Sequence, residues 1–220
     1  MVNILRYCRA VWVALILLLI PFTALSDHNG VPHTSTQSVK LLLLGDSLSA
    51  AYGLTTDQGW VSLLQNKWND AHTDIEIVNA AISGETSDGG LARLPRLLEQ
   101  HKPSHLLIQL GGNDGLQGHN VNKLRNNLRE MTSLAKSAGI TVMIQEMYIP
   151  TNYGRRYNQM FTSSFSLVAE EKDVPLVPFF LTEIALNQDL MQRDGIHPNA
   201  EAQPMIAEIM RESLEPLLIE

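Results

Sequence analysis

The chain has 220 residues, with 16 lysines and arginines against 23 aspartates and glutamates and a formal net charge of −7 at pH 7. Its length suits one domain with a substantial hydrophobic core and is too short for two domains of ordinary size. The acidic balance argues against nucleic acid or an anionic membrane surface as the main partner.

The first residues have the pattern of a secretory signal peptide. Two arginines precede the apolar run 10–20, and a proline and the Ala-Leu-Ser sequence 24–26 follow it. The run is shorter than the roughly 18 apolar residues that a membrane-spanning helix needs. We therefore predict a cleaved signal peptide over residues 1–26, no stable membrane anchor afterwards, and a periplasmic or secreted protein. Cys8, the only cysteine, would leave with the signal peptide, so the mature chain would have no disulfide.

After a polar stretch over residues 27–38, which we expect to be a flexible lead-in, residues 39–220 are predicted to form a single domain. Strands are predicted over 40–44, 75–78, 105–110, 141–145 and 176–177, helices over 59–68, 90–100, 121–137, 159–171 and about 203–218, and a loop over 147–157. Strands that alternate with helices imply a parallel sheet with right-handed crossovers. We predict the α/β class: a flavodoxin-like three-layer α/β/α sandwich with a five-stranded parallel sheet in the order 2-1-3-4-5.

The first strand ends in a serine motif. The apolar run 41–44 is followed by Gly45-Asp46-Ser47-Leu48-Ser49, which places Ser47 at the carboxyl end of that strand. Ligands of open α/β sheets bind outside this edge, and a helix beginning at Ser47 would add oriented N–H groups. For the isolated motif a helix cap is the more common role, because Asp and Ser are both favoured N-cap residues.

Two histidines fall on the same edge of the predicted sheet as Ser47. His119 follows the third strand, and His197 follows the fifth, three residues after Asp194. A serine nucleophile needs a base, and the base works better when a carboxylate orients it. His119 has no acid three residues away, so we predict His197 as the base and Asp194 as its partner. The alternative is a surface turn in which Asn199 caps a helix and His197 is merely solvated.

Two loops on this edge offer donors for an oxyanion. Gly84, after the second strand, can bring a backbone N–H close to a ligand, and Asn113, after the third, carries a side-chain amide. In other enzymes such a donor contributes roughly 3–4 kcal/mol. Either loop alone is more often a simple turn. Together with Ser47 and the Asp194–His197 turn, however, they place four polar clusters on one edge.

These clusters resemble, in the same order, the four sequence blocks of the GDSL or SGNH serine hydrolases. The matching stretches are Gly45-Asp46-Ser47-Leu48-Ser49, Gly84, Gly111-Gly112-Asn113-Asp114 and Asp194-Gly195-Ile196-His197-Pro198. The resemblance covers nearly all of residues 39–218. It implies the SGNH hydrolase fold, with Ser47 as nucleophile, His197 as general base and then acid, and Asp194 as the partner that orients His197.

The resemblance also implies an oxyanion hole and a shallow acyl groove. The hole would consist of the Ser47 and Gly84 N–H groups and the Asn113 amide. The groove would lie between segments 115–120 and 149–157, and its expected substrate-binding residues are Leu116, Ile149, Pro150 and Tyr153. Two positions depart from the family pattern: Ala51 stands where many relatives have glycine, and Ile149 where close relatives often have leucine. Both departures bear on chain-length preference and not on the reaction.

The leading hypothesis is a serine esterase that hydrolyses acyl esters and thioesters through an acyl-enzyme on Ser47. Enzymes of this type include lysophospholipases, acyl-CoA thioesterases and arylesterases, and the reaction requires no metal and no cofactor. We expect a small-molecule acyl ester or thioester as substrate, no nucleic-acid partner, and a monomer. A carbohydrate O-acetylesterase of the same family is the first alternative.

Two further alternatives belong to other functional classes. A metal-dependent phosphoesterase would gather Asp46, Asn113, Asp114, Asp194 and His197, although their spacing matches no ligand pattern. A flavodoxin-like binding module would need no catalytic group, since fold alone does not imply function. The sequence contains neither the G-x-S-x-G elbow of α/β-hydrolases nor a glycine-rich phosphate loop.

Overall fold

Five parallel strands form the centre of the domain. The computed structural model describes residues 38–219, so the predicted signal peptide and all but the last residue of the predicted lead-in lie outside the described residues. The strands are β1 (Val39–Gly45), β2 (Ile75–Asn79), β3 (His105–Gln109), β4 (Thr141–Gln145) and β5 (Leu176–Val177). Their order in the sheet is β2-β1-β3-β4-β5, and every neighbouring pair is parallel. The predicted fold class and strand order are confirmed.

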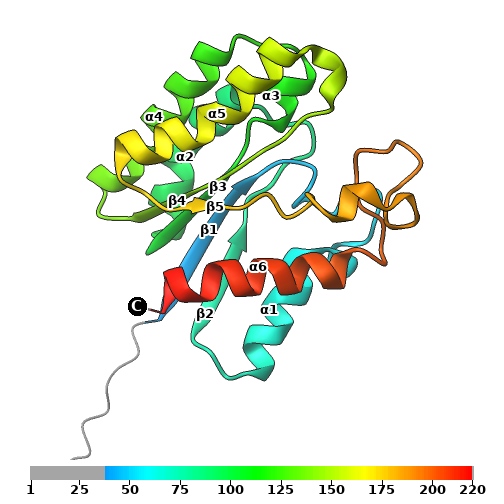
Figure 1. Ribbon diagram of the computed structural model, residues 1–220. Helices are drawn as coiled ribbons and strands as arrows, with labels where there is room; N and C mark the ends of the chain where they lie inside the picture. Colours follow the sequence, from blue (N-terminus) through cyan, green and yellow to red (C-terminus); the bar gives the residue numbers. More distant parts are fainter. Residues whose placement is uncertain (1–37, 220) are drawn as a thin grey trace, which may run out of the picture. The chain divides into compact units, whose positions relative to one another are not determined.

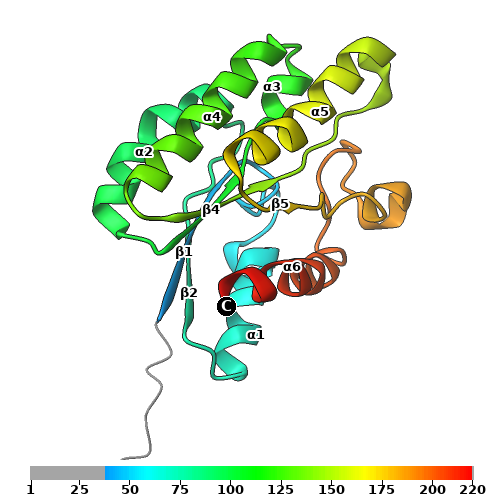
Figure 2. The ribbon, with the colours of Figure 1, turned by 60° about the vertical axis from the view of Figure 1, so that its left-hand side comes forward.

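Helices cover both faces of this sheet (Figure 1 and Figure 2). On one face α1 (Trp60–Asp70) packs against α6 (Gln203–Leu218), and on the other α2 (Ser87–His101), α4 (Val121–Ser137) and α5 (Arg155–Lys172) lie side by side. The short helix α3 (Gly112–Leu116) follows β3, and 3-10 turns occur at Thr56–Gln58, Thr151–Tyr153, Ile184–Leu186 and Gln188–Leu190. Among residues 38–219, no helix is long and apolar enough to cross a membrane.

The two helical layers explain why β1 consists of an unbroken apolar run. Successive side chains of a strand point to opposite faces of the sheet, and both faces are covered here, so all four leucines 41–44 are fully buried. Burying each such side chain contributes about 1.5–3 kcal/mol relative to leaving it exposed. This strand is therefore both the centre of the core and the support for the serine motif that follows it.

Three elements differ from the sequence-based expectation. Helix α2 begins at Ser87 and α5 at Arg155, earlier than the predicted starts at 90 and 159, and residues 112–116 form α3 instead of a loop. The first turns of α2 and α5 are mainly polar and carry no apolar periodicity, which is why the pattern misses them. The loop predicted over 147–157 accordingly ends at Gly154.

The helix considered at Ser47 is also absent, since residues 47–50 form tight turns. The carbonyl oxygen of Asp46 accepts the backbone N–H groups of Ser49 at 3.2 Å and Ala50 at 3.0 Å. Ala51 then adopts a left-handed conformation with φ of 55°. A left-handed residue interrupts the right-handed course of a helix, so Ser47 lies in a turn and not at the start of a helix.

Candidate active site

Loops that follow four of the strands meet at the carboxyl edge of the sheet. Ser47 follows β1, Gly84 follows β2, Asn113 lies in the first turn of α3 after β3, and His197 lies between β5 and α6. The strands β1, β2 and β3 are aligned in register, for example at Leu42, Val78 and Leu106, so their ends reach the same level. As a result, these four residues all line one cavity of about 650 Å³.

Ser47, His197 and Asp194 form a continuous hydrogen-bonded chain. The Oγ atom of Ser47 lies 2.8 Å from His197 Nε2, and His197 Nδ1 lies 2.7 Å from Asp194 Oδ2. When Nδ1 donates its proton to the carboxylate, Nε2 is left as the acceptor for the serine hydroxyl. This is the arrangement that a base needs in order to remove the hydroxyl proton.

Asp194 is held in its ionised form by its own turn. Its Oδ1 accepts the backbone N–H groups of Ile196 at 2.9 Å and His197 at 3.0 Å. Partial burial by itself would raise the pKa of the Asp194 carboxyl, but these bonds, together with the bond from the His197 ring, bring the pKa below its usual value. An ionised carboxylate beside Nδ1 stabilises the imidazolium that forms when His197 accepts a proton.

Two residues that the sequence analysis did not single out support His197. The ring of Tyr52 packs against the imidazole with a centroid distance of 4.3 Å and an interplanar angle of 33°. Gln192 donates its backbone N–H to the His197 carbonyl at 2.8 Å and its side-chain Nε2 to the Tyr52 carbonyl at 2.8 Å. These contacts tie the loop after β5 to the loop after β1. The spacing of the three residues in the sequence contains no signal for this contact.

A buried polar cluster lies beneath Ser47. The Asp46 carboxylate, 2% exposed, accepts the backbone N–H of Leu48 at 3.0 Å and the side-chain amide of Gln109 at 3.1 Å. Burial raises the pKa of Asp46 to about 6, although these two hydrogen bonds oppose the increase. Gln109 also accepts the Ser49 hydroxyl. The cluster holds the turn that presents Ser47, and Gln109 is a further member that the sequence pattern did not indicate.

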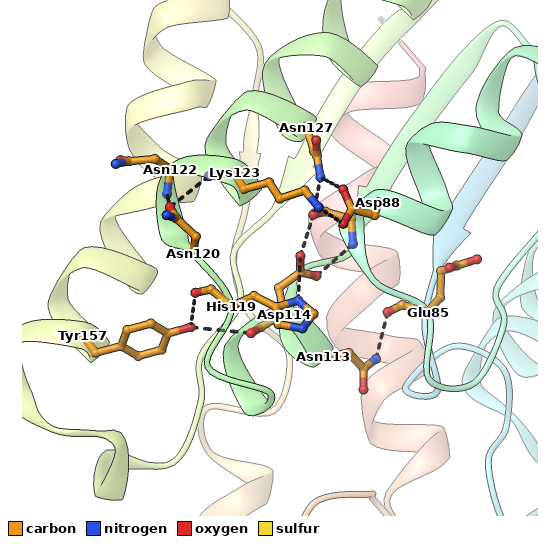
Figure 3. Close-up of polar contacts among 11 residues, drawn as sticks. Glu85, Asp88, Asn113, Asp114, His119, Asn120, Asn122, Lys123, Asn127 and Tyr157 are labelled. Atoms are coloured by element: carbon orange, nitrogen blue, oxygen red, sulfur yellow. Dashed lines mark hydrogen bonds and ion pairs between the residues drawn. The ribbon is translucent and has the colours of Figure 1, made fainter.

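The two predicted oxyanion loops face the same cavity. Gly84 adopts φ of 82°, and no heavy atom lies within 4 Å of the position that a Cβ would occupy. Asn113 donates its Nδ2 group to the Glu85 carbonyl at 2.9 Å (Figure 3). A primary amide carries two N–H donors, so the second remains available to an oxygen atom in the cavity.

The walls of the cavity are mainly apolar. Of the four predicted substrate-binding residues, Leu116, Ile149 and Pro150 line it. Tyr153 does not, but its hydroxyl donates to the Leu116 carbonyl at 2.7 Å and so supports the wall from behind. Further apolar residues that were not predicted to contact the substrate also line the cavity: Met147, Phe179, Leu181, Ala185, Met191 and Ile196.

His119 and Asp114, one of the acidic residues of the phosphoesterase alternative, do not line this cavity. The Nδ1 atom of His119 is 3.9 Å from Asp114 Oδ1, so His119 does have an acidic neighbour, five residues earlier in the chain. Asp114 is buried and accepts the N–H and the hydroxyl of Ser87. In the described part of the chain, no three His, Cys, Asp or Glu side chains group as metal ligands.

Comparison with known proteins gives consistent matches over the described domain. The model of the GDSL-like Lipase/Acylhydrolase family matches residues 43–203. The chain is 47% identical over 178 residues to thioesterase 1/protease 1/lysophospholipase L1 of Escherichia coli K12, covering 81% of this chain and 84% of the relative. It is 48% identical to esterase TesA of Pseudomonas aeruginosa, covering 81% and 89%. The crystal structure of esterase EstA from Pseudoalteromonas superposes with a TM-score of 0.81 at 49% identity, covering 82% of this chain and 99% of EstA.

Proposed function

The chain belongs to the GDSL-like Lipase/Acylhydrolase family and is a serine esterase, and we propose that Ser47, His197 and Asp194 carry its reaction. The observation that supports these roles most directly is the hydrogen-bonded chain from Ser47 Oγ through His197 to Asp194, with bonds of 2.8 and 2.7 Å. A nucleophile, a base and an orienting acid in this order are what acyl transfer to a serine requires.

The proposed reaction has two steps. Ser47 Oγ attacks the acyl carbonyl carbon while His197 Nε2 takes the hydroxyl proton, and Asp194 stabilises the resulting imidazolium. His197 then returns the proton to the departing alkoxide or thiolate, which leaves an acyl ester on Ser47. In the second step water attacks this ester, His197 accepts a proton from the water and returns it to Ser47 Oγ, and the carboxylic acid leaves.

The tetrahedral intermediate of each step carries a negative oxygen. We assign its stabilisation to the backbone N–H groups of Ser47 and Gly84 and to the free N–H of Asn113. Two observations on Gly84 support this assignment: the space beside its backbone is open, and its φ is positive, so a side chain at that position would be strained. In other enzymes the loss of one such donor lowers kcat by about 10²–10³-fold.

The apolar wall of the cavity favours a substrate with a hydrocarbon acyl chain. Leu116, Ile149 and Pro150 are proposed to contact that chain, as part of a cavity of about 650 Å³. An acetyl group would leave most of this wall without a partner, and a sugar would find few polar partners on it. The cavity therefore supports acyl esters and thioesters over the carbohydrate O-acetylesterase alternative.

The decisive experiment is a hydrolysis panel run with the wild type and Ser47→Ala. The panel contains p-nitrophenyl esters of increasing chain length, acyl thioesters, lysophospholipids and acetylated sugars. We expect Ser47→Ala to lose all turnover and all labelling by a fluorophosphonate, and Ser62→Ala, which removes a half-buried hydroxyl on α1 outside the cavity, to behave as the wild type. Turnover retained by Ser47→Ala would disprove the assignment. A higher kcat/KM for acetylated sugars than for longer acyl esters would favour the alternative.

The cellular setting of this activity is also proposed. The signal-peptide pattern of residues 1–26 supports export to the periplasm or secretion, where lysophospholipids and other envelope esters are available. The mature protein would then act as a monomer on small-molecule esters. Mass spectrometry of the exported protein should give an N-terminus near Asp27; a mature protein that keeps residues 1–26 would contradict the export proposal.

A further inference from the structure

The two oxyanion loops are joined by direct contacts between them. Asn113 donates its side-chain amide to the carbonyl of Glu85, next to Gly84 (Figure 3). Asp114, the residue after Asn113, makes a second link: its carboxylate accepts the backbone N–H of Ser87 at 2.8 Å and the Ser87 hydroxyl at 2.6 Å. Both carboxylate oxygens of Asp114 are therefore used to bind one residue of the neighbouring loop.

Asp114 acts as the N-terminal cap that helix α2 lacks in its own sequence. Thr86 occupies the N-cap position of α2, but its side chain makes no capping hydrogen bond. The first N–H groups of a helix need an external acceptor, and the positive end of the helix favours a negative charge there. Asp114 supplies both from the neighbouring helix α3. The cap therefore links two elements that are 27 positions apart in the chain.

A second layer of polar contacts holds this cap in place. Asn127 of α4 donates to the Ser87 hydroxyl at 2.9 Å and to Asp88 at 2.8 Å, and Lys123 pairs with Asp88. Figure 3 shows Asn127, Lys123 and Asp88 close together next to Asp114. Asp114 is only 4% exposed, so water does not compete effectively for its bonds to Ser87.

We propose that Asp114 is a positioning residue that sets the separation of the Gly84 N–H and the Asn113 amide. This inference rests on the proposed function of these two groups as oxyanion donors. Ser87 is three residues from Gly84, and Asp114 is adjacent to Asn113, so the bond between Ser87 and Asp114 limits how far the two donors can move apart. Donors of this kind must be held to within about 0.5 Å of the productive geometry.

The loss of Asp114 should affect the transition state more than substrate binding. The oxyanion exists only after Ser47 has attacked, so its donors contribute to kcat and little to the ground-state complex. A misplacement of about 1 Å can cost about 100-fold in rate. A residue with a purely structural role would instead lower stability without a selective effect on kcat.

The test compares Asp114→Asn with matched controls. The amide retains one oxygen acceptor of the two that bind Ser87, and we expect kcat to fall by about 10- to 100-fold while KM stays within about three-fold. The inhibition constant of a long-chain trifluoromethyl ketone, which adds to Ser47 Oγ and leaves an oxyanion, should rise in proportion to the loss of kcat/KM. The control Asp70→Asn makes the same chemical change at an exposed position of α1, and should keep the wild-type kcat.

Variants of Ser87 give an independent test that leaves the buried Asp114 carboxylate unchanged. Ser87→Ala removes the hydroxyl bond and should lower kcat about ten-fold or less, and Ser87→Thr should restore it. Ser164→Ala removes an equally buried serine hydroxyl on α5 and should leave kcat unchanged. Thermal unfolding of each variant identifies those that fold; if Asp114→Asn does not, the Ser87 series decides.

Two results would overturn the positioning role. The first is a wild-type kcat and inhibitor affinity in folded Asp114→Asn, and the second is a wild-type kcat in Ser87→Ala when Asp114→Asn does not fold. Ser47→Ala, measured in parallel, separates this failure from failure of the proposed function. Turnover by Ser47→Ala would disprove the proposed function itself, whereas an inactive Ser47→Ala beside a fully active Asp114→Asn would overturn only the role of Asp114.

Discussion

Replacement of the buried carboxyl beneath the nucleophile, Asp46→Asn, should change how stability depends on pH. Burial raises the pKa of Asp46 in the folded protein from an ordinary value of 3.8 to about 6. Below pH 3.8 the carboxyl is protonated in both the folded and the unfolded chain. As pH rises, the unfolded chain releases its proton first, so the folded state loses stability until its own carboxyl ionises near pH 6.

The size of this effect follows from the two pKa values. Their difference, 6 − 3.8 = 2.2, corresponds to about 3 kcal/mol at about 1.4 kcal/mol for each pH unit. The free energy of unfolding of the wild type should therefore fall by about 3 kcal/mol relative to Asp46→Asn between about pH 3 and pH 7. Asparagine keeps the oxygen that accepts the bonds from Leu48 and Gln109, so the comparison isolates the cost of the buried charge.

The measurement is urea unfolding at a series of pH values, followed by the fluorescence of the buried residues Trp60 and Trp68. Asp57→Asn is the matched control. Asp57 is exposed, and a hydrogen bond from the Thr55 side chain lowers its pKa. The free energy of unfolding of Asp57→Asn should therefore change with pH relative to the wild type in the opposite direction, and only by a small amount. The reasoning would be refuted if the free energy of unfolding of the wild type, relative to that of Asp46→Asn, stayed constant or rose from pH 4 to pH 7.

Three further predictions concern the residues around Ser47. Asp194→Asn should lower kcat by about 10³–10⁴-fold, because an amide neither fixes the imidazole tautomer nor stabilises the imidazolium; steady-state kinetics with a saturating ester measure this, and a loss of less than about ten-fold would contradict the role of Asp194. Tyr52→Leu should lower kcat about five-fold through loss of roughly 1 kcal/mol of aromatic stabilisation of the charged His197 ring, and Tyr52→Phe should retain the activity; equal losses in both variants would assign the effect to the hydroxyl. Ala51→Gly should relieve a left-handed conformation that costs about 1–2 kcal/mol. The greater chain entropy of glycine in the unfolded state offsets about 0.4–1 kcal/mol of this gain, so the midpoint of thermal unfolding should rise slightly. A lower midpoint would show that the Ala51 methyl group packs favourably.

Several features of this protein follow from local sequence patterns. The leucine run 41–44 indicates a strand buried on both faces, and the alternation of strands and helices predicts the parallel sheet and its order. The pairing of Asp194 with His197 is equally local, because one turn with a separation of three positions suffices to bring the two side chains to 2.7 Å. Ser47, Gly84 and Asn113 each follow a strand of the parallel sheet, and this places all three on one edge.

The supporting contacts depend instead on packing between distant segments. Asp46 is buried only once distant segments pack against it, among them β3, whose Gln109 donates to its carboxylate, and the pKa near 6 results from that burial. The Tyr52 ring meets His197 only because the loops after β1 and β5 reach the same end of the sheet. No spacing in the sequence relates these residues, so no pattern could have identified them.

The sequence alone therefore determines the strands, their order and the identity of the chemical groups at the carboxyl edge, because these depend on periodicity and on short local turns. The tertiary structure decides how those groups are held. It replaces the helix considered at Ser47 with a tight turn, since Ala51 is left-handed, and it caps α2 with Asp114 from another helix. These features depend on hydrogen bonds and burial between elements, which exist only after the elements have packed.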